Sequence, residues 1–200
     1  MKWSKLRLLS MLSAMVVSTN VQAVDSEGSF SVDGAGFQPC SQFVKAVEGQ
    51  KNDLYVYIGW VDGYLSHYNR VTPNTFDITP WQTQYMTVKT LHLLCGKQPQ
   101  APFATAVESL VVQLEPHKLT EQSERVVISD GDAQIQIYVA VIEQIQAKLQ
   151  HKSLVDTYKK GEFDDATRAG LKRFQQQSGL KVTGMPDQDT LLRLLLVPSR

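Results

Sequence analysis

Residues 161 to 191 read Gly161-Glu-Phe-Asp-Asp-Ala-Thr-Arg-Ala-Gly-Leu-Lys-Arg-Phe-Gln-Gln-Gln-Ser-Gly-Leu-Lys-Val-Thr-Gly-Met-Pro-Asp-Gln-Asp-Thr-Leu191. This stretch predicts two short helices with a glycine-containing turn between them. Asp164 lies at the N-cap position of the first helix, where its carboxylate can accept backbone N–H groups. Gly179 lies where a left-handed residue commonly ends a helix, and Asp187 begins the second helix after a turn at Gly184.

Both predicted helices have an apolar face. In the first helix, Thr167, Leu171 and Phe174 follow one another at intervals of three and four residues. Leu180, just after the glycine, can fold back and close this face. In the second helix, the residues of the apolar face are Thr190, Leu191, Leu194 and Leu195. Both faces are therefore expected to point into a core.

The spacing Gly-x-Phe-Asp-x-x-Thr-x-x-x-Leu-x-x-Phe-Gln-x-x-x-Gly-Leu-x-x-Thr-Gly-x-x-Asp-x-x-Thr-Leu-x-x-Leu resembles the peptidoglycan-binding type 1 module. That module is a small three-helix bundle appended to many cell-wall enzymes and envelope proteins. The segment from Val141 to Leu149 resembles its first helix, with Gln146 in the usual position. The resemblance covers about residues 137–197, and we expect the domain at 134–197. Residues 152–160 are polar and charged, where the family usually carries a Gly-Tyr-rich loop.

The resemblance implies a set of signature residues. They are Phe163, Asp164, Thr167, Phe174, Gln175, Gly179, Leu180, Thr183, Gly184, Asp187 and Thr190. The apolar members are expected to pack in the core, whereas the aspartates and glycines set caps and turns. Ligand contact is expected only from polar groups near the helix junctions, such as Gln175, Thr183 and Asp187. The implied partner is peptidoglycan, although type 1 modules also serve purely as protein-docking units.

The first 23 residues are typical of a secretory signal peptide. A basic start precedes an apolar segment, Leu8 to Val17, that is too short for a comfortable membrane span. Small residues up to Ala23 suit a cleavage site, and the alternative is an uncleaved anchor. We therefore expect export to a periplasm, a flexible N-terminus at residues 24–37 and no membrane span in the mature chain.

Charge is divided unevenly along the chain. The 200 residues include 20 basic and 20 acidic side chains. Residues 24–139 carry 7 basic and 13 acidic side chains, whereas residues 140–200 carry 10 and 7. A mildly basic C-terminal part suits an anionic polymer such as the wall, whose peptides carry carboxylates, but it is equally an ordinary solvated surface. Because no basic stripe with interleaved aromatic residues is present, we expect no nucleic-acid partner.

The chain has two cysteines, Cys40 and Cys95. In an exported chain an isolated pair predicts a disulfide, which would close a loop of about 55 residues and stabilise the fold by roughly 4 kcal/mol. The alternatives are metal ligation, which would need more Cys or His at close spacing, and a catalytic cysteine, which would need a histidine partner.

Residues 38–115 predict a domain of four amphipathic helices tied together by this disulfide. The apolar repeats run over residues 40–47, 54–68, 81–95 and 103–114. Gly49 and Gly96 supply end signals for the first and third helices. Gly59 and Gly63 lie inside the second helix, where each costs about 1 kcal/mol relative to alanine. We expect them to permit close helix packing, with a ligand site as the alternative.

A polar and mostly acidic linker is expected at residues 116–133. Within it, residues 126–128 could form a short strand or a docking segment, and helix is expected again from Ala133. The predicted fold class is therefore all-α, with an N-terminal four-helix disulfide-tied domain and a C-terminal three-helix peptidoglycan-binding-like bundle.

The first domain also resembles a broad group of small helical periplasmic proteins with one disulfide. The shared features are the segment from Tyr57 to Asn69, the Cys95-Gly-Lys-Gln-Pro99 end and the segment from Phe103 to Ala106. The group includes HdeA-type acid-stress chaperones and the immunity proteins that neutralise injected wall amidases. The resemblance leaves three hypotheses: a domain that holds an envelope protein near the wall, an acid-stress chaperone, and an inhibitor of a wall hydrolase.

The sequence contains no recognisable catalytic pattern. The four histidines are scattered and form no His-x-His or His-Glu-x-x-His arrangement for a catalytic zinc. There is no Gly-x-Ser-x-Gly elbow and no phosphate-binding glycine loop. Asp164 and Asp165 are adjacent, but neighbours at a helix start face different ways, which disfavours a glycosidase pair. We therefore expect a non-enzymatic protein that needs no cofactor and no metal.

Overall fold

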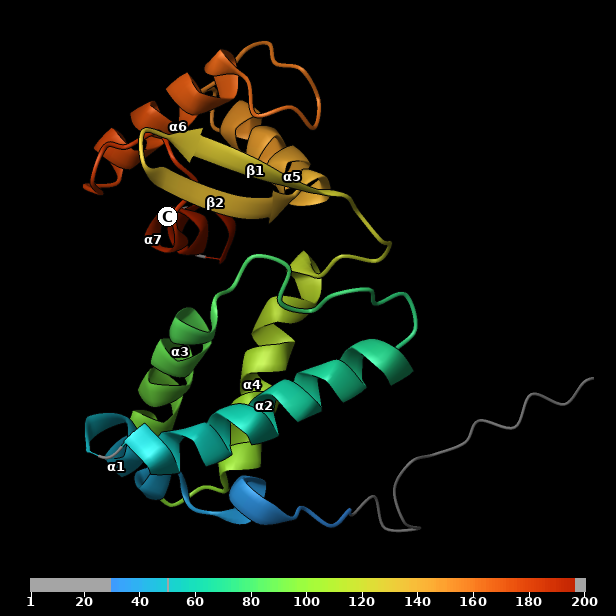
Figure 1. Cartoon of the computed structure of the whole chain (residues 1–200), viewed down its shortest axis with the longest axis vertical. Coiled ribbons are helices and arrows are strands. Elements are labelled where there is room, and N and C mark those ends of the chain that lie inside the picture. The colour runs from blue at the N-terminus through green and yellow to red at the C-terminus, as the bar shows by residue number, and fades with distance from the viewer. Residues whose placement is uncertain (1–29, 50, 197–200) are drawn as a thin grey trace, which may run out of the picture. The chain divides into compact units, whose positions relative to one another are not determined.

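The computed structural model describes residues 30–49 and 51–196 (Figure 1). The predicted signal peptide at residues 1–23 lies outside the described residues. The described part contains seven α-helices and one two-stranded sheet. From Val32 onward, the described residues belong to one compact unit. The expected helical class is therefore right in outline, and the sheet is a correction to the all-α expectation.

Four helices follow one another between residues 40 and 114. They are α1 (Cys40–Glu48), α2 (Lys51–Val71), α3 (Gln84–Lys97) and α4 (Phe103–Leu114). Their positions agree with the apolar repeats of the sequence, except that α3 begins at Gln84 rather than Trp81. The reason is a cap, because the Thr83 side chain accepts a hydrogen bond from the backbone N–H of Met86 at 3.3 Å. That these four helices form a domain of their own stays a prediction.

The predicted disulfide between Cys40 and Cys95 is present and joins α1 to α3, with 4.9 Å between the two Cα atoms. Both cysteines belong to a first hydrophobic core. Three aromatic rings pack together in this core, namely Phe43, Tyr57 and Phe103, with ring centroids 4.6 to 5.3 Å apart. Helices α1, α2 and α4 each contribute one of these rings. The first core is therefore shared among helices that are distant in sequence.

A short 3-10 helix, η1 (Gly34–Phe37), packs against α2 and α4. The indole Nε1 of Trp60 donates a hydrogen bond to the carbonyl of Asp33 at 3.0 Å. A Cβ added to Gly36 would lie 2.2 Å from the Trp60 ring, so only glycine fits there. Gly34 and Gly36, within the predicted flexible N-terminus at residues 24–37, therefore lie against this indole.

Gly59 and Gly63 do not provide the predicted close helix packing. Both are exposed on α2, and a Cβ added to either would meet no described atom within 4 Å. The prediction is therefore wrong for the described part of the chain, and nothing in the structure explains these two glycines.

An antiparallel hairpin occupies the segment predicted to be linker and helix start. Strand β1 (Arg125–Asp130) pairs with β2 (Ala133–Tyr138), and Asp130 lies opposite Ala133. Gly131 in the turn has a φ of 58°, a left-handed conformation that favours glycine. The predicted helix from Ala133 is wrong, because apolar and polar residues alternate at 134–137 and suit a strand instead.

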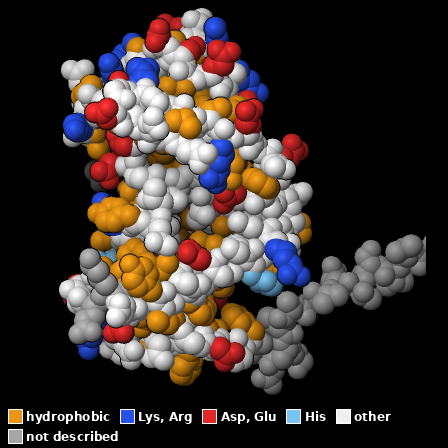
Figure 2. Space-filling view, viewed as in Figure 1, with side chains coloured by type: hydrophobic (Ala, Val, Ile, Leu, Met, Phe, Trp, Pro, Cys, Tyr) orange, Lys and Arg blue, Asp and Glu red, His pale blue; other side chains and the backbone are white. Residues whose placement is uncertain are grey.

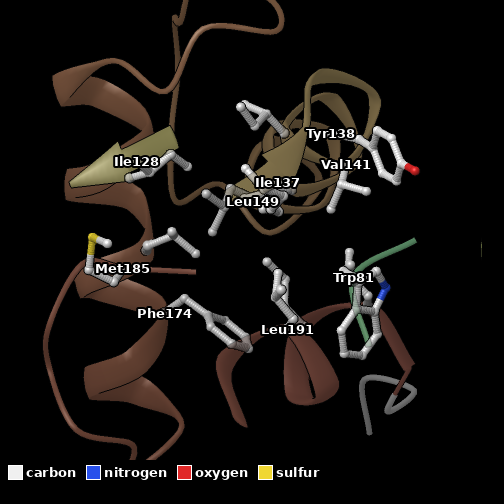
Figure 3. Close-up of a cluster of buried hydrophobic side chains, with 14 of the residues drawn as sticks. Trp81, Ile128, Ile137, Tyr138, Val141, Leu149, Phe174, Met185 and Leu191 are labelled. Carbon is white, nitrogen blue, oxygen red and sulfur yellow. The ribbon is translucent and has the colours of Figure 1, made fainter. Parts of the chain in front are cut away.

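Three helices follow the hairpin. They are α5 (Val139–His151), α6 (Asp165–Gln177) and α7 (Gln188–Leu191), and a π-helical turn, η3 (Leu192–Leu196), continues α7. A second hydrophobic core lies among the hairpin and these helices (Figure 3). Its members include Ile128, Ile137, Val141, Leu149, Phe174, Met185 and Leu191. Trp81 and Leu119 belong to the same core, so it extends beyond the three helices.

Because Gly63 is exposed and its missing Cβ would meet nothing, we predict that Gly63→Ala stabilises the protein. The expected gain in free energy of unfolding is about 0.5–1 kcal/mol, from the higher helix propensity of alanine. Denaturant unfolding followed by circular dichroism measures this. Gly36→Ala is the matched control and should destabilise, because its methyl group would collide with Trp60. A destabilising Gly63→Ala would contradict the described environment of α2.

Candidate functional site

The loop before α6 is held by the amide of one buried glutamine, Gln146 of α5, which is 0% exposed. Its Nε2 donates to the carbonyls of Lys159 at 3.0 Å and Glu162 at 2.7 Å, and approaches Thr167 Oγ1 at 3.0 Å. Its Oε1 accepts a hydrogen bond from the backbone N–H of Gly161 at 2.9 Å. One side chain therefore supplies the hydrogen-bond partners that regular secondary structure would otherwise give to this loop's backbone.

The loop before α7 is held in the same way by Gln175 of α6, which is also 0% exposed. Its Nε2 lies 3.1 Å from Thr183 Oγ1, 3.0 Å from the Met185 carbonyl and 2.9 Å from Thr190 Oγ1. Its Oε1 accepts the backbone N–H groups of Thr183 at 2.9 Å and Gly184 at 2.7 Å. Each glutamine thus fixes where the next helix begins.

The two loops have the same local sequence, Gly-x-x-Asp-x-x-Thr, at residues 161–167 and 184–190. Both glycines have a left-handed φ, 76° at Gly161 and 72° at Gly184. A Cβ added to either would approach a neighbouring side chain to within 3.0 Å. The caps and turns of these loops were predicted from the sequence, whereas the repeat and the role of the two glutamines were not. The signal that could have revealed the role of the glutamines is the repeated seven-residue pattern, each copy of which follows a helix that contains a glutamine.

The predicted caps are present. Asp164 accepts the backbone N–H of Thr167 at 2.8 Å, and Asp187 accepts that of Thr190 at 2.9 Å. At the end of α6, Gly179 has a φ of 68°. The N–H of Leu180 donates to the Gln175 carbonyl at 2.9 Å, which closes a Schellman motif.

Asp164 accepts more hydrogen bonds than a simple cap. Its Oδ1 also accepts from the Thr167 hydroxyl at 2.7 Å, and its Oδ2 accepts the backbone N–H of Lys159 at 2.8 Å. Burial alone would raise the pKa of Asp164, but these hydrogen bonds and the charge of Lys159 together hold that pKa below its usual value. The ionised carboxylate therefore stabilises the folded state.

The three polar residues proposed for ligand contact form one internal network. Gln175 is fully buried, whereas Thr183 and Asp187 are half-buried. The Thr183 hydroxyl lies 3.3 Å from Asp187 Oδ2 as well as within reach of Gln175. Among the other signature residues, Phe174, Thr167 and Thr190 are buried, and Phe163 is half-buried beneath the guanidinium of Arg168. The structure thus brings the signature together as an internal framework.

A cleft of about 350 Å³ lies next to this framework. One wall is β2, from Gln134 to Ile137, and the other is the start of α7 with Asp187 and Gln188. Gln188 also contacts the segment before α3, since its Oε1 accepts the Thr83 N–H at 2.9 Å and its Nε2 lies 2.6 Å from the Trp81 carbonyl. The cleft therefore combines elements of the second core with a segment from earlier in the chain.

No group of three or more His, Cys, Asp or Glu side chains in the described part of the chain is placed to hold a metal ion. No described helix has the length and apolar character needed to cross a membrane.

Comparison with known proteins gives one result that agrees with this framework. Residues 140–194, from α5 to η3, match the model of a family described as "Putative peptidoglycan binding domain". No curated protein and no solved structure matches the chain. The C-terminal resemblance is therefore supported by an independent comparison, and what is matched is a binding domain. The expected HdeA-type resemblance of the first helices has no such support.

We predict that Gln175→Ala destabilises the protein by about 2–4 kcal/mol. The substitution leaves the backbone N–H groups of Thr183 and Gly184 without their acceptor, at about 1–3 kcal/mol for each buried group. Chemical denaturation measures the loss. Gln177→Ala, an exposed position on the same helix, is the control and should change stability by less than about 0.5 kcal/mol. Equal effects of the two substitutions would contradict the assigned role.

We predict a pH-dependent effect of Asp164→Asn. Because the pKa of Asp164 is lowered in the folded state, its contribution is fully present above the unfolded pKa of about 4 and disappears as pH falls through the folded pKa. The stability difference between wild type and variant should therefore be largest near neutral pH and shrink toward pH of about 3. Thermal unfolding across this range tests it, with the exposed Asp156→Asn as control. A stability difference between wild type and variant that does not change with pH would contradict this role of Asp164.

Proposed function

We propose that this chain is a non-enzymatic, exported envelope protein that binds peptidoglycan through residues 140–194. The observation that carries the proposal is the agreement between the family match and the geometry of the same residues. Both buried glutamines, both capped helix starts and the closing Schellman turn are in place. A chain that resembled the family in composition alone would not be expected to form this hydrogen-bond framework.

We place the binding surface outside the signature residues, because the polar side-chain atoms of Gln175, Thr183 and Asp187 are hydrogen-bonded to one another. The surface of the C-terminal part has an excess of basic side chains, which suits the carboxylates of wall peptides. The proposal therefore assigns recognition to exposed groups around the framework, and the framework itself keeps those groups in fixed positions.

The proposal also places helices α1 to α4 near the wall as a site for another envelope protein. Large apolar side chains are exposed there: Phe37 is 71%, Tyr55 64% and Val56 63% exposed. Phe37 and Val56 line a cavity of about 960 Å³ between η1, α1 and α2. Figure 2 shows hydrophobic side chains at the surface in the lower half of the view, where these helices lie. Exposed apolar groups in such a cavity favour a protein partner.

Export to the periplasm is part of the proposal. It is supported by the signal-peptide pattern of residues 1–23 and by the disulfide, since disulfides persist in oxidising compartments such as the periplasm.

Co-sedimentation of the mature chain with purified insoluble peptidoglycan, at low and at high salt, tests the proposal. We expect the protein to sediment with the wall and to return to the supernatant after muramidase digestion of the wall. Gln175→Ala should lose sedimentation under conditions where Gln177→Ala keeps it. If the wild-type chain stays in the supernatant at both salt concentrations, the proposal that residues 140–194 bind peptidoglycan is wrong.

A further inference from the structure

A second cavity, of about 540 Å³, lies between α5 and a 3-10 turn, η2 (Glu115–His117). His117 lines it from η2, Gln144, Lys148 and His151 line it from α5, and Leu195 of η3 contributes an apolar wall. We call it the basic cavity. Its volume is within the range of small-ligand sites and admits a group as large as a short peptide. None of its polar residues belongs to the signature described above.

The cavity-lining polar residues of α5 share one helix face, because Gln144, Lys148 and His151 are separated by four and three residues. Cations in the last turn of a helix are common, since they interact favourably with its negative end. That explanation covers Lys148 and His151 but not His117, which reaches the same cavity from a different element. Three basic groups from two elements therefore converge on one space.

Among the described residues, none of these three groups forms an ion pair with a carboxylate, although the Oε2 atom of Glu115 on η2 is buried without a hydrogen-bond partner. On η2, Glu115 pairs with Lys118 at 2.8 Å, and on α5, Glu143 pairs with Lys160 at 3.3 Å. The charged residue of η3, Arg193, is itself basic. Burial first, and the charge of Lys148 second, lower the pKa of His117. Lys148 is thus the permanent positive charge of the cavity, and the two histidines add to it when they are protonated.

Gln144 supplies a further polar group. Its Oε1 is buried and has no hydrogen-bond partner among the described residues. Buried polar atoms are nearly always paired, so the side-chain amide of Gln144, a residue that lines the cavity, keeps unused hydrogen-bonding capacity. A half-turn of the amide would turn its NH2 group toward an anion in the cavity.

We propose that the basic cavity binds a free carboxylate of the peptide part of peptidoglycan. This inference rests on the proposed function and names the chemical group that is recognised. Lys148 supplies the permanent charge, Gln144 a neutral donor, and His117 and His151 additional charge when protonated. A carboxylate with a pKa near 4 stays largely ionised at pH of about 5, whereas His117, whose pKa is lowered, gains most of its charge below pH of about 6.5. Affinity for the carboxylate should therefore rise as pH falls.

The test uses the full mature chain and a soluble muramyl dipeptide with a free carboxylate, and the methyl ester of the same compound serves as ligand control. Binding is measured by calorimetry or NMR titration at pH of about 8 and pH of about 5. The acid should bind more tightly than the ester, and Lys148→Gln should weaken its binding about five-fold. Lys181→Gln, which removes an exposed charge elsewhere in the same part of the chain, should leave it unchanged. The gain in affinity at pH of about 5 should disappear in the double variant His117→Gln/His151→Gln.

The same variants are assayed for sedimentation with insoluble peptidoglycan, which separates the two proposals. If the wild type sediments with the wall but binds acid and ester equally, or if Lys148→Gln behaves like Lys181→Gln, the basic cavity is not the carboxylate site and wall binding stands. If the wild type neither sediments nor binds the dipeptide, both proposals are overturned.

Discussion

The C-terminal part of this protein depends on two buried side-chain amides. A loop without regular secondary structure must find partners for its backbone N–H and C=O groups, because leaving them buried and unpaired is unfavourable. Gln146 and Gln175 provide those partners for the loops that precede α6 and α7. The amide suits this role because it offers both a donor and an acceptor from one fixed position. The two glutamines thereby set the start of both helices.

Because these polar atoms are used inside the domain, the residues that hold the fold differ from those proposed to recognise a ligand. The residues that make the family pattern visible in the sequence are those whose polar atoms are used internally, so their presence indicates a fold and not a contact. Other contacts join this framework to parts of the chain outside the family match. Arg168 of α6 donates to the Ser129 carbonyl of the hairpin at 3.0 Å, and Gln188 of α7 contacts Trp81 and Thr83. The hairpin and the segment before α3 lie outside residues 140–194, and they shape the cleft beside Asp187.

Local signals explain what the sequence could predict. Caps, helix-ending glycines and apolar repeats act within a few residues, so Asp164, Gly179, Asp187 and the spans of α1 to α4 could be placed from the sequence. The first strand of the hairpin was one of the alternatives predicted for residues 126–128, and β1 confirms it. The second strand was missed because residues from Ala133 were predicted to be helical, although the Asp130-Gly131 turn and the alternation that follows it indicate a hairpin. The glutamine contacts and the basic cavity join residues that are distant along the chain, so no local pattern reveals them.

The central claim is that the two glutamine amides, and not a ligand or solvent, hold these loops in place. Amide hydrogen exchange of the full mature chain, read by NMR at the N–H groups of Gly161 and Gly184, tests it most directly. The account predicts protection at both amides close to that of the interior of α6, because their acceptors are the buried Oε1 atoms of Gln146 and Gln175. Exchange at the rate of an exposed loop, with α6 still protected, would contradict it.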